Sequence, residues 1–522
     1  MESEQESPTS GASAGLTPNG APAGPPADAA QPTFARDLGL GSATAIVMGT
    51  MIGSGIFIVS AQMSRQLQSP GLLLLAWLVT GFLTIAGALC YGELAAAMPH
   101  AGGQYVYLRE SLGSIFGFLY GWTLFVVIQT GTIAAVAIAF SKFLGVLFPW
   151  VAETRWLFLF GQWGPVKFGL NTMELVALGA IILLTYFNSR GVKTGAWIQN
   201  IFTAAKILAL LGVIALGWFV ARNAVAVAAN FQHFWSGMGW GHWHVFQANG
   251  RTMVASTIGV IFIAMVGSLF SSDSWNNVTF TAGEIRDPRR NIPLSLVLGT
   301  GAVTVLYLLA NVAYLNVLPL WGHAGAATVL GRGIQHASED RVATAVVSVA
   351  FGHIGAALMA LAIMISCFGC VNGLILSGAR VYYAMAKDRL FFRRIAELHP
   401  RSRVPVFGLW VQAVWACLLC LSGTYNQLLE YVMFAEFVFY ILTIAGLFFL
   451  RWRQPNLPRP YRTLAYPVLP ALYLAGAVFF DWEILRVFPS YTGAGLLLVL
   501  IGVPVYFFWK LRSRSRPATT NP

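Results

Sequence analysis

Charged residues are scarce in this sequence: they make up 10% of its 522 residues, whereas an ordinary soluble domain carries about 25%. Apolar residues account for 57% of the chain, and the mean hydropathy is +0.67. A water-soluble fold of this length could not bury so much apolar surface. The composition therefore excludes a soluble protein and indicates one that lies in a membrane.

Cysteine is also rare, with five residues, all inside hydrophobic runs: Cys90, Cys367, Cys370, Cys417 and Cys420. Two pairs have the CxxC spacing of metal clips, but both fall in the middle of an expected helix, without the turn that such clips use. We interpret them as small packing residues and expect no metal and no other cofactor.

The first 32 residues contain no Lys or Arg and are rich in Ala, Gly, Pro and Ser. A secretory signal peptide would need a basic start and an apolar core. We expect residues 1–32 to form a disordered cytoplasmic tail, residues 33–512 to form the membrane domain, and residues 513–522 to form a second cytoplasmic tail.

Hydrophobic runs long enough to cross a bilayer recur through the chain, and they predict an all-α membrane protein with twelve transmembrane helices. The expected spans are 38–62, 71–98, 111–148, 171–188, 195–220, 253–281, 292–318, 343–386, 405–423, 426–450, 464–486 and 490–510.

The loops between these spans differ in charge. If the N-terminus is cytoplasmic, the inner segments hold more than twice as many Lys and Arg as the outer ones, which is the asymmetry of a multi-pass protein with both termini inside. The plasma (inner) membrane is the expected location. The net charge of +12 is spread over many loops, so we expect no nucleic-acid partner. The basic run from Arg380 to Arg403 is expected to face lipid headgroups.

Two of the expected spans are interrupted. The first contains three glycines within residues 49–57, and the sixth contains serines, an aspartate and two asparagines within residues 267–277. Unwound backbone at this depth is tolerated only where it lines a cavity. Breaks at corresponding places in two five-helix halves indicate a transporter with its site near the bilayer midplane. The alternative is that the glycines serve close helix packing.

Such breaks offer receptors for both ends of an α-amino acid. Exposed amides at the start of a half-helix bind a carboxylate, and we expect them in Ser54, Gly55 and Ile56, with Ile52 and Gly53 also at the substrate site. Carbonyl groups at the end of a half-helix attract an ammonium group, and residues 267–270, which begin with Gly267 and Ser268, are the candidates.

Lys206 lies near the middle of the fifth span, where an ionisable residue indicates a functional site. Its ammonium group could replace a bound cation by donating to carbonyls of the first span, or it could release a proton during transport. The alternative is a lysine that extends to the membrane interface.

Four motifs in order resemble the L-type amino-acid transporters of the amino acid–polyamine–organocation superfamily. They are residues 49–57, 199–206, 270–276 and 366–373, and the resemblance runs from about residue 36 to residue 510. It implies a LeuT-like five-plus-five inverted repeat (33–220 and 252–450, followed by two extra helices in 464–510), alternating access, and sodium-independent uptake or exchange of L-amino acids.

The resemblance also implies roles for single residues. Lys206 would occupy a cation position, and Phe270 would be an aromatic gate over the substrate unless it is an ordinary packing residue. Trp275 and Asn276 belong to the sixth-span motif and are expected to line the site. Glu436 in the tenth span falls at a position that, in the family, influences which substrate side chains are accepted. It could instead pair with another buried polar group or be protonated.

Two departures from the family bear on function. Animal members join a glycoprotein through a cysteine after the third span, but residues 149–170 contain none, so no disulfide-linked subunit is expected. Asp273 stands where many neutral-amino-acid members have Gly or Ser. It could bind a cationic side chain together with Glu436, or it could cap the second half-helix.

Other functions fit less well. A channel should show filter or ring sequences, and none appears. A membrane enzyme should show a nucleophile with a base, but Ser54 and Ser366 have no evident histidine partner within the spans, so we do not expect an enzyme. An amino-acid-sensing receptor is a further alternative, but the tails are short. Within transport, a proton-coupled symporter that prefers cationic amino acids or polyamines remains an alternative.

Overall fold

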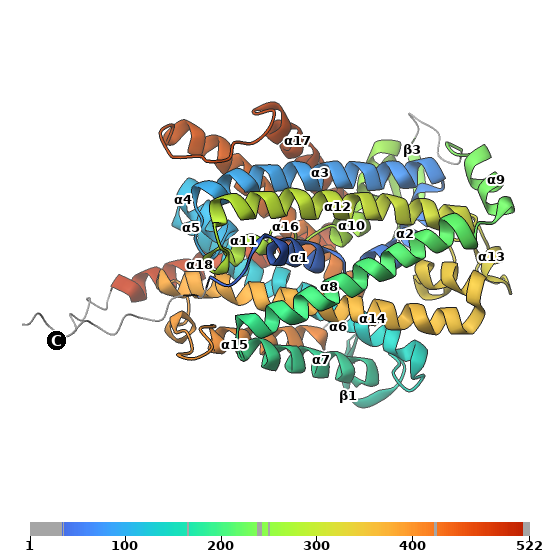
Figure 1. Ribbon diagram of the computed structural model, residues 1–522, viewed down its shortest axis with the longest axis horizontal. Helices are drawn as coiled ribbons and strands as arrows, with labels where there is room; N and C mark the ends of the chain where they lie inside the picture. Colours follow the sequence, from blue (N-terminus) through green and yellow to red (C-terminus); the bar gives the residue numbers. More distant parts are fainter. Residues whose placement is uncertain are drawn as a thin grey trace, which may run out of the picture. The chain divides into compact units, whose positions relative to one another are not determined.

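The computed structural model describes residues 34, 36–163, 166–236, 243–248, 251–421 and 425–514. Long helices run side by side along the long axis of the molecule (Figure 1). The expected N-terminal tail lies outside the described residues, whereas the helix of the last expected span continues to Arg514.

The first expected span is two helices, α1 (Leu40–Met51) and α2 (Gly55–Leu67). The next helix, α3 (Pro70–Ala97), begins at a proline, and the side chain of Ser69 caps its first turn by accepting from the Leu72 amide. A short helix that the sequence did not predict, α4 (Gln104–Ser111), follows.

The third expected span combines α5 (Ser114–Thr123) and α6 (Gln129–Leu147) across a π-helical turn, Leu124–Ile128. Beyond it, α7 (Thr172–Ser189) starts at a capping box of Asn171 and Glu174. The fifth span is α8 (Val192–Ala215), which ends in a second π-helical turn, Leu216–Val220, before α9 (Ala224–Gln232).

Two antiparallel hairpins were not predicted. One pairs β1 (Trp156–Trp163) with β2 (Val166–Asn171), and the other pairs β3 (Trp243–Ala248) with β4 (Arg251–Ser256). The strand β4 extends into the first residues of the sixth expected span, 253–281, so the helix of that span starts later than predicted, at Thr257.

The sixth span, like the first, is broken into two helices, α10 (Thr257–Ser271) and α11 (Asn277–Phe280). The remaining helices follow the predicted spans apart from the short α13, and a kink at Gly352 bends α14. They are α12 (Pro288–Val317), α13 (Val329–Arg332), α14 (Val342–Lys387), α15 (Val406–Cys420), α16 (Tyr425–Arg453), α17 (Val468–Val487) and α18 (Pro489–Arg514).

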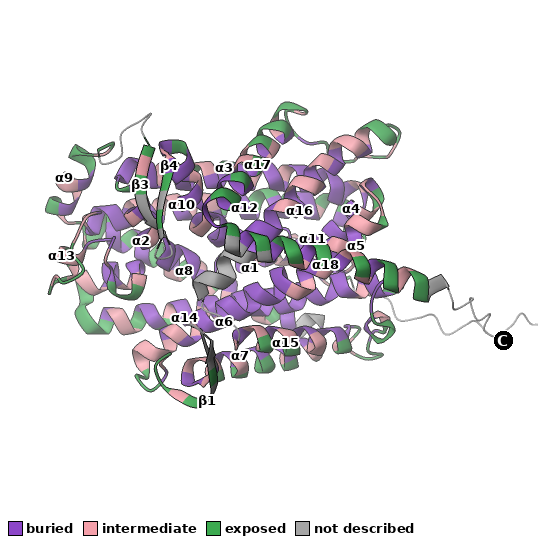
Figure 2. Cartoon of the chain, turned by 180° about the vertical axis from the view of Figure 1, so that it is seen from behind, coloured by how far each residue is buried: buried purple, intermediate pink, exposed green. Residues whose placement is uncertain are grey.

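Ten spans of the described chain are long and apolar enough to cross a membrane. Two further predicted spans contain shorter apolar helices, Thr257–Ser271 and Val406–Cys420. Buried residues fill the centre of the helix bundle, and exposed ones cover its surface (Figure 2). These features define an integral, multi-pass membrane protein.

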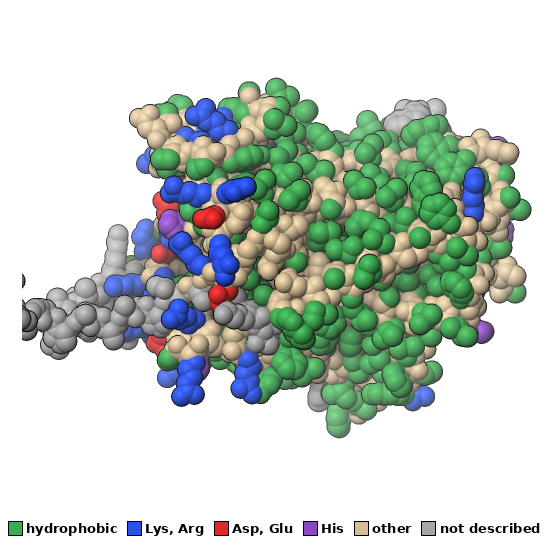
Figure 3. Space-filling view, in the orientation of Figure 1, with side chains coloured by type: hydrophobic (Ala, Val, Ile, Leu, Met, Phe, Trp, Pro, Cys, Tyr) green, Lys and Arg blue, Asp and Glu red, His purple; other side chains and the backbone are tan. Residues whose placement is uncertain are grey.

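Basic side chains gather at one end of the molecule, where α4 and α5 lie, while the face toward the viewer is largely hydrophobic (Figure 3). Arg380 does not belong to this basic surface. Its side chain is 1% exposed and pairs with the equally buried Glu284 at 2.9 Å. Burial raises the pKa of the Glu284 carboxyl, and Arg380 opposes this rise. The prediction that the basic run faces lipid is therefore wrong for Arg380.

Candidate functional site

The two broken helices meet in the middle of the molecule. Residues 52–54 separate α1 from α2, and residues 272–276 separate α10 from α11, so both breaks fall inside the predicted segments. The Thr50 hydroxyl donates to the Ser274 carbonyl at 2.9 Å, which ties one break to the other. A Cβ atom on Gly55 would lie 3.0 Å from the Ser271 Cα. Glycine at position 55 therefore permits the start of α2 to approach the end of α10 closely.

A tyrosine on α12 links the same two helix ends. The Tyr307 hydroxyl lies 3.1 Å from the Met51 carbonyl and 2.9 Å from the Ser271 carbonyl. These are the last residues of α1 and α10, whose carbonyls lack partners within their own helices. Tyr307 thus links the two half-helix ends to each other.

The first amides of α2 lack a partner within their own helix. Gly55 and Ile56 are its first two residues, so no helical carbonyl lies one turn earlier for their N–H groups. The carbonyls of Ile52 and Gly53 face another partner, because the Ser366 hydroxyl of α14 lies 3.0 Å from each. The break therefore directs carbonyls toward α14 and leaves amides at the positive end of α2, where a carboxylate binds favourably.

The carbonyls at the end of α10 already accept hydrogen bonds. Those of Ser268 and Leu269 receive the Ser272 amide at 3.0 and 3.1 Å, and that of Phe270 receives the Asp273 amide at 3.2 Å. Gly267 accepts from the Ser271 hydroxyl at 2.8 Å. These carbonyls are therefore engaged within the end of α10, and their role as an ammonium receptor stays a prediction.

Lys206 is fully buried, and its ammonium group reaches the first break. Nζ donates to the carbonyls of Gly49 at 2.8 Å and Ile52 at 2.7 Å. The side chain therefore does not extend to the membrane interface, and that alternative is wrong. Contact with carbonyls of the first span is what replacement of a bound cation requires, while the role itself stays a prediction.

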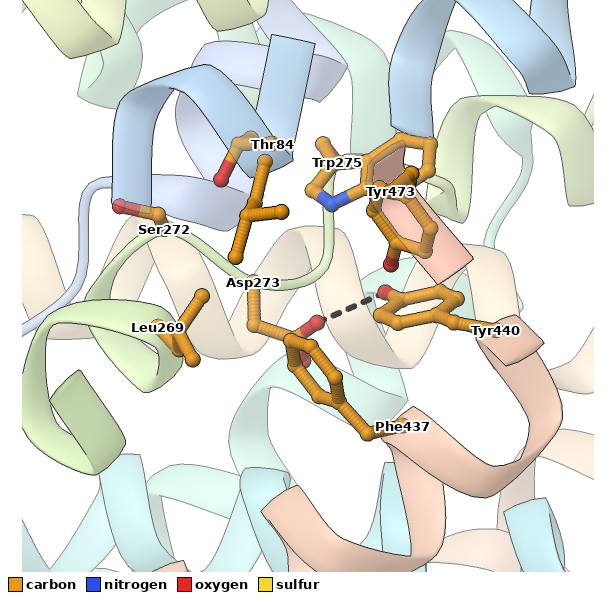
Figure 4. A pocket seen from close by; sticks show the side chains of 9 residues that line it. Thr84, Leu269, Ser272, Asp273, Trp275, Phe437, Tyr440 and Tyr473 are labelled. Carbon is orange, nitrogen blue, oxygen red and sulfur yellow. Dashed lines mark hydrogen bonds between the residues drawn. The ribbon is translucent and has the colours of Figure 1, made fainter. Parts of the chain in front are cut away.

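Asp273 lies in the second break and faces α16 (Figure 4). Its Oδ1 accepts from the Tyr440 hydroxyl at 2.7 Å, and its Oδ2 accepts from the Ser274 hydroxyl at 3.4 Å. The residue before α11 is Asn276, and no side chain caps that helix. The interpretation of Asp273 as a helix cap is therefore wrong.

A small cavity, on the scale of a single water molecule, opens beside Asp273 (Figure 4). Residues from α3, α10, the second break, α16 and α17 line it: Leu83, Thr84, Leu269, Ser272, Asp273, Trp275, Phe437, Tyr440 and Tyr473. No residue of the first break lines this cavity. It lies on the side of the second break that faces α16 and α17.

The remaining polar candidates are joined through the second break. Asn276 donates to Gln104 Oε1 at 2.9 Å and to Glu436 Oε1 at 3.2 Å. Glu436 therefore pairs with a buried polar group, one of the alternatives open from sequence. The Trp275 ring stacks on Tyr440, with centroids 5.3 Å apart and planes 22° apart.

Other predicted residues of this span are packed against neighbours. A Cβ atom on Gly267 would lie 2.9 Å from the Cβ of Val59, so this glycine brings α10 close to α2. The Ser268 hydroxyl bonds to that of Thr80 at 2.7 Å. Phe270 is buried near the end of α10, and its role as a gate stays a prediction.

Sequence reasoning missed the tyrosines of the site. Tyr440 follows Glu436 by four residues and therefore lies on the same helix face, a spacing that could have identified it. Tyr307 and Tyr473 stand alone in apolar spans, where they look like core aromatics, and no local pattern distinguishes them.

The described residues contain no group of three or more His, Cys, Asp or Glu side chains that could hold a metal ion. All five cysteines are free thiols. Cys370 contacts the first break, with its Sγ 3.0 Å from the Thr50 carbonyl.

Two broken helices that meet inside a bundle of apolar helices are characteristic of membrane transporters. A family model described as amino acid permease matches residues 38–510, and the chain belongs to that family. It is 30% identical to the human large neutral amino acids transporter small subunit 2, over 91% of this chain and 81% of that one. It is 29% identical to the serine/threonine exchanger SteT of Bacillus subtilis, over 92% and 98%.

A third relative is the mouse b(0,+)-type amino acid transporter 1, which is 29% identical over 93% of this chain and 91% of its own length. These relatives are L-type transporters of the amino acid–polyamine–organocation superfamily, which confirms the resemblance seen in the motifs. They are transporters and not enzymes, as predicted for this chain.

Proposed function

We propose that this protein is a sodium-independent secondary transporter that takes up or exchanges L-amino acids by alternating access. The observation that carries this proposal is the contact of Lys206 Nζ with the Gly49 and Ile52 carbonyls. A fixed ammonium group there supplies the positive charge that a bound cation would otherwise bring to the broken helix. The names of the relatives, which include neutral amino acids and a serine/threonine exchanger, support an amino-acid substrate.

The substrate would bind between the two breaks. The amides of Ser54, Gly55 and Ile56 would receive its carboxylate, and the carbonyl end of α10 would receive its ammonium group. The support is the contact of α2 with α10 at Gly55. The substrate's side chain would point toward Asp273 and Glu436, and Phe270 would close over it.

The proposed membrane arrangement has twelve spans. Residues 33–220 and 252–450 would form two inverted five-helix repeats, and residues 464–510 would add two helices. The breaks support this division because each falls in the first helix of a repeat. The end of the molecule rich in Lys and Arg would face the cytoplasm (Figure 3), with both termini, in the plasma membrane.

Uptake into proteoliposomes tests the proposal. Vesicles preloaded with amino acid should accumulate labelled leucine, serine, alanine or arginine, and replacing sodium with potassium should leave the rate unchanged. Uptake that requires sodium would contradict the role given to Lys206. Absence of uptake for every amino acid, in protein that remains folded, would contradict the function.

A second candidate function is proton-coupled symport of cationic amino acids or polyamines. It is favoured by two buried carboxylates: Asp273 lines the cavity, and Glu436 bonds to Asn276 of the same break. Neither belongs to an ion pair found in the described chain. A pH gradient alone should then drive arginine into vesicles that hold no amino acid. If only preloaded vesicles accumulate label, exchange is obligatory and this candidate is excluded.

We expect no disulfide-linked subunit, because residues 149–170 contain no cysteine. Expression of the chain alone should therefore suffice for transport.

A further inference from the structure

Glu436 is a buried carboxylate with an oxygen that lacks a partner. The residue is 2% exposed. Its Oε1 accepts from the Asn276 amide, whereas its Oε2 is buried and makes no hydrogen bond within the described chain. An ionised carboxylate left in this condition inside a membrane is strongly disfavoured.

A second acid lies close by. Tyr440, one turn after Glu436 on α16, donates to Asp273 at 2.7 Å, and Asn276 of the same break donates to Glu436. Asp273 has two hydroxyl donors, from Tyr440 and Ser274, while Glu436 has one amide donor. Hydrogen bonding therefore favours the charged form at Asp273 more than at Glu436.

The other titratable groups around the pair are weak acids. The charge of Glu436 acts on Tyr91 of α3, Tyr120 of α5, Tyr440 of α16 and Tyr473 of α17, and the charge of Asp273 acts on Cys370 of α14. None of these groups carries a positive charge at neutral pH. The buried cation nearest the breaks, Lys206, is bonded to the Gly49 and Ile52 carbonyls.

We propose that Glu436 is a proton-binding site and that the proton resides on Oε2. A proton from water joins the carboxylate and leaves one negative charge on the pair, at Asp273. Asn276 lies in the second break, so the state of Glu436 is coupled to the segment where substrate is expected. Loss of the proton places two negative charges in the same buried region and favours separation of α16 from the break.

Infrared spectroscopy of the purified protein tests this directly. At neutral pH the protein should absorb in the C=O stretching region of protonated carboxylic acids, and Glu436→Gln should remove part of that absorption. Glu93→Gln is the matched control. Glu93 is 1% exposed, but it accepts from Arg451 at 2.8 and 2.6 Å and is therefore ionised. An unchanged band in Glu436→Gln would overturn the proposal.

Two further measurements keep the result interpretable. Asp481 of α17 also has a buried oxygen without a partner, so Asp481→Asn identifies its share of the absorption. If Glu436→Gln does not fold, the pH titration of the carboxylic-acid band in the wild type and in Asp273→Asn tests the proposal instead. Removal of the neighbouring charge should shift loss of the Glu436 band toward lower pH, and an identical titration would overturn the proposal.

The consequence for transport rests on the proposed function and is tested separately. Wild-type uptake should vary with pH, and the profile of Glu436→Gln should be flat. If the wild type transports no amino acid, the proposed function fails while the infrared result still decides the proton site. Transport without a Glu436 band overturns this inference alone.

Discussion

The ammonium nitrogen of Lys206 lies 2.7 Å from the carbonyl oxygen of Ile52, the first residue after α1 ends. A second carbonyl, that of Gly49, lies 2.8 Å away. The charge of the buried lysine and the carbonyls of the broken helix therefore satisfy each other. This contact places a fixed positive charge at the broken first span, which is the basis for the sodium independence that we propose.

Lys206→Ala should reduce uptake by about tenfold or more. The change leaves the Gly49 and Ile52 carbonyls without a charged donor, a loss of about 1.5–3 kcal/mol for each hydrogen bond. Labelled leucine uptake into proteoliposomes measures the effect. Lys142→Ala, at the partly exposed end of α6, is the control and should transport normally. Unaltered uptake by Lys206→Ala would discard the role of cation substitute.

Asp273→Ser should lower arginine uptake about tenfold more than leucine uptake. Leucine has no charge for the carboxylate to bind, whereas a cationic side chain loses its partner in a buried site. The ratio of the two rates in the same vesicles is the measurement, and Ser272→Ala in the same break is the control. Equal losses for both substrates would remove Asp273 from side-chain selection.

Tyr440→Phe should destabilise the protein by about 1–3 kcal/mol, because Asp273 loses a buried donor. The ring remains and still stacks on Trp275. Thermal unfolding in detergent provides the comparison. Tyr382→Phe is a matched control, since its buried hydroxyl has no partner within the described chain. Equal shifts for the two variants would show that the bond to Asp273 contributes nothing.

Gly55→Ala should impair both packing and transport. The added methyl group would meet Ser271, whose Cα lies 3.0 Å from its position, and overpacking of this kind costs about 1–3 kcal/mol. Gly301→Ala in α12 is the control because nothing lies within 4 Å of its added Cβ. That variant should gain up to about 1 kcal/mol from helix propensity. A stable, active Gly55→Ala would refute the close approach of α2 to α10.

Glu284→Gln should be strongly destabilising, by about 3–5 kcal/mol, because it leaves the buried Arg380 without a counter-charge. The double variant Glu284→Gln, Arg380→Met should recover much of this loss. Denaturation of the single and double variants provides the test. No recovery in the double variant would show that packing, and not charge pairing, accounts for the loss.

The helices and their breaks were predictable because their signals are local. Long apolar runs define the spans, and glycines or clustered polar residues mark residues 49–57 and 267–277. The hairpin β1–β2 was not predicted, because its first strand opens with a short continuous apolar run, and periodicity alone does not distinguish such a strand from a buried helix segment.

Contacts between distant parts of the chain were not predictable in the same way. Arg380 looked like a surface charge because its partner, Glu284, lies 96 residues earlier. Tyr307 bonds to Met51 across 256 residues, and no sequence pattern within α12 predicts that contact. The hydrogen bond of Asp273 with Tyr440 likewise depends on how α16 packs against the break.

The most direct test of the central claim is an experimental structure of the protein in a lipid nanodisc with a bound amino acid. The account predicts that the ligand carboxylate lies within hydrogen-bond distance of the Gly55 and Ile56 amides, and that its ammonium group faces the carbonyl end of α10. First and sixth spans that run unbroken across the bilayer, or an amino acid bound away from both of them, would contradict the account.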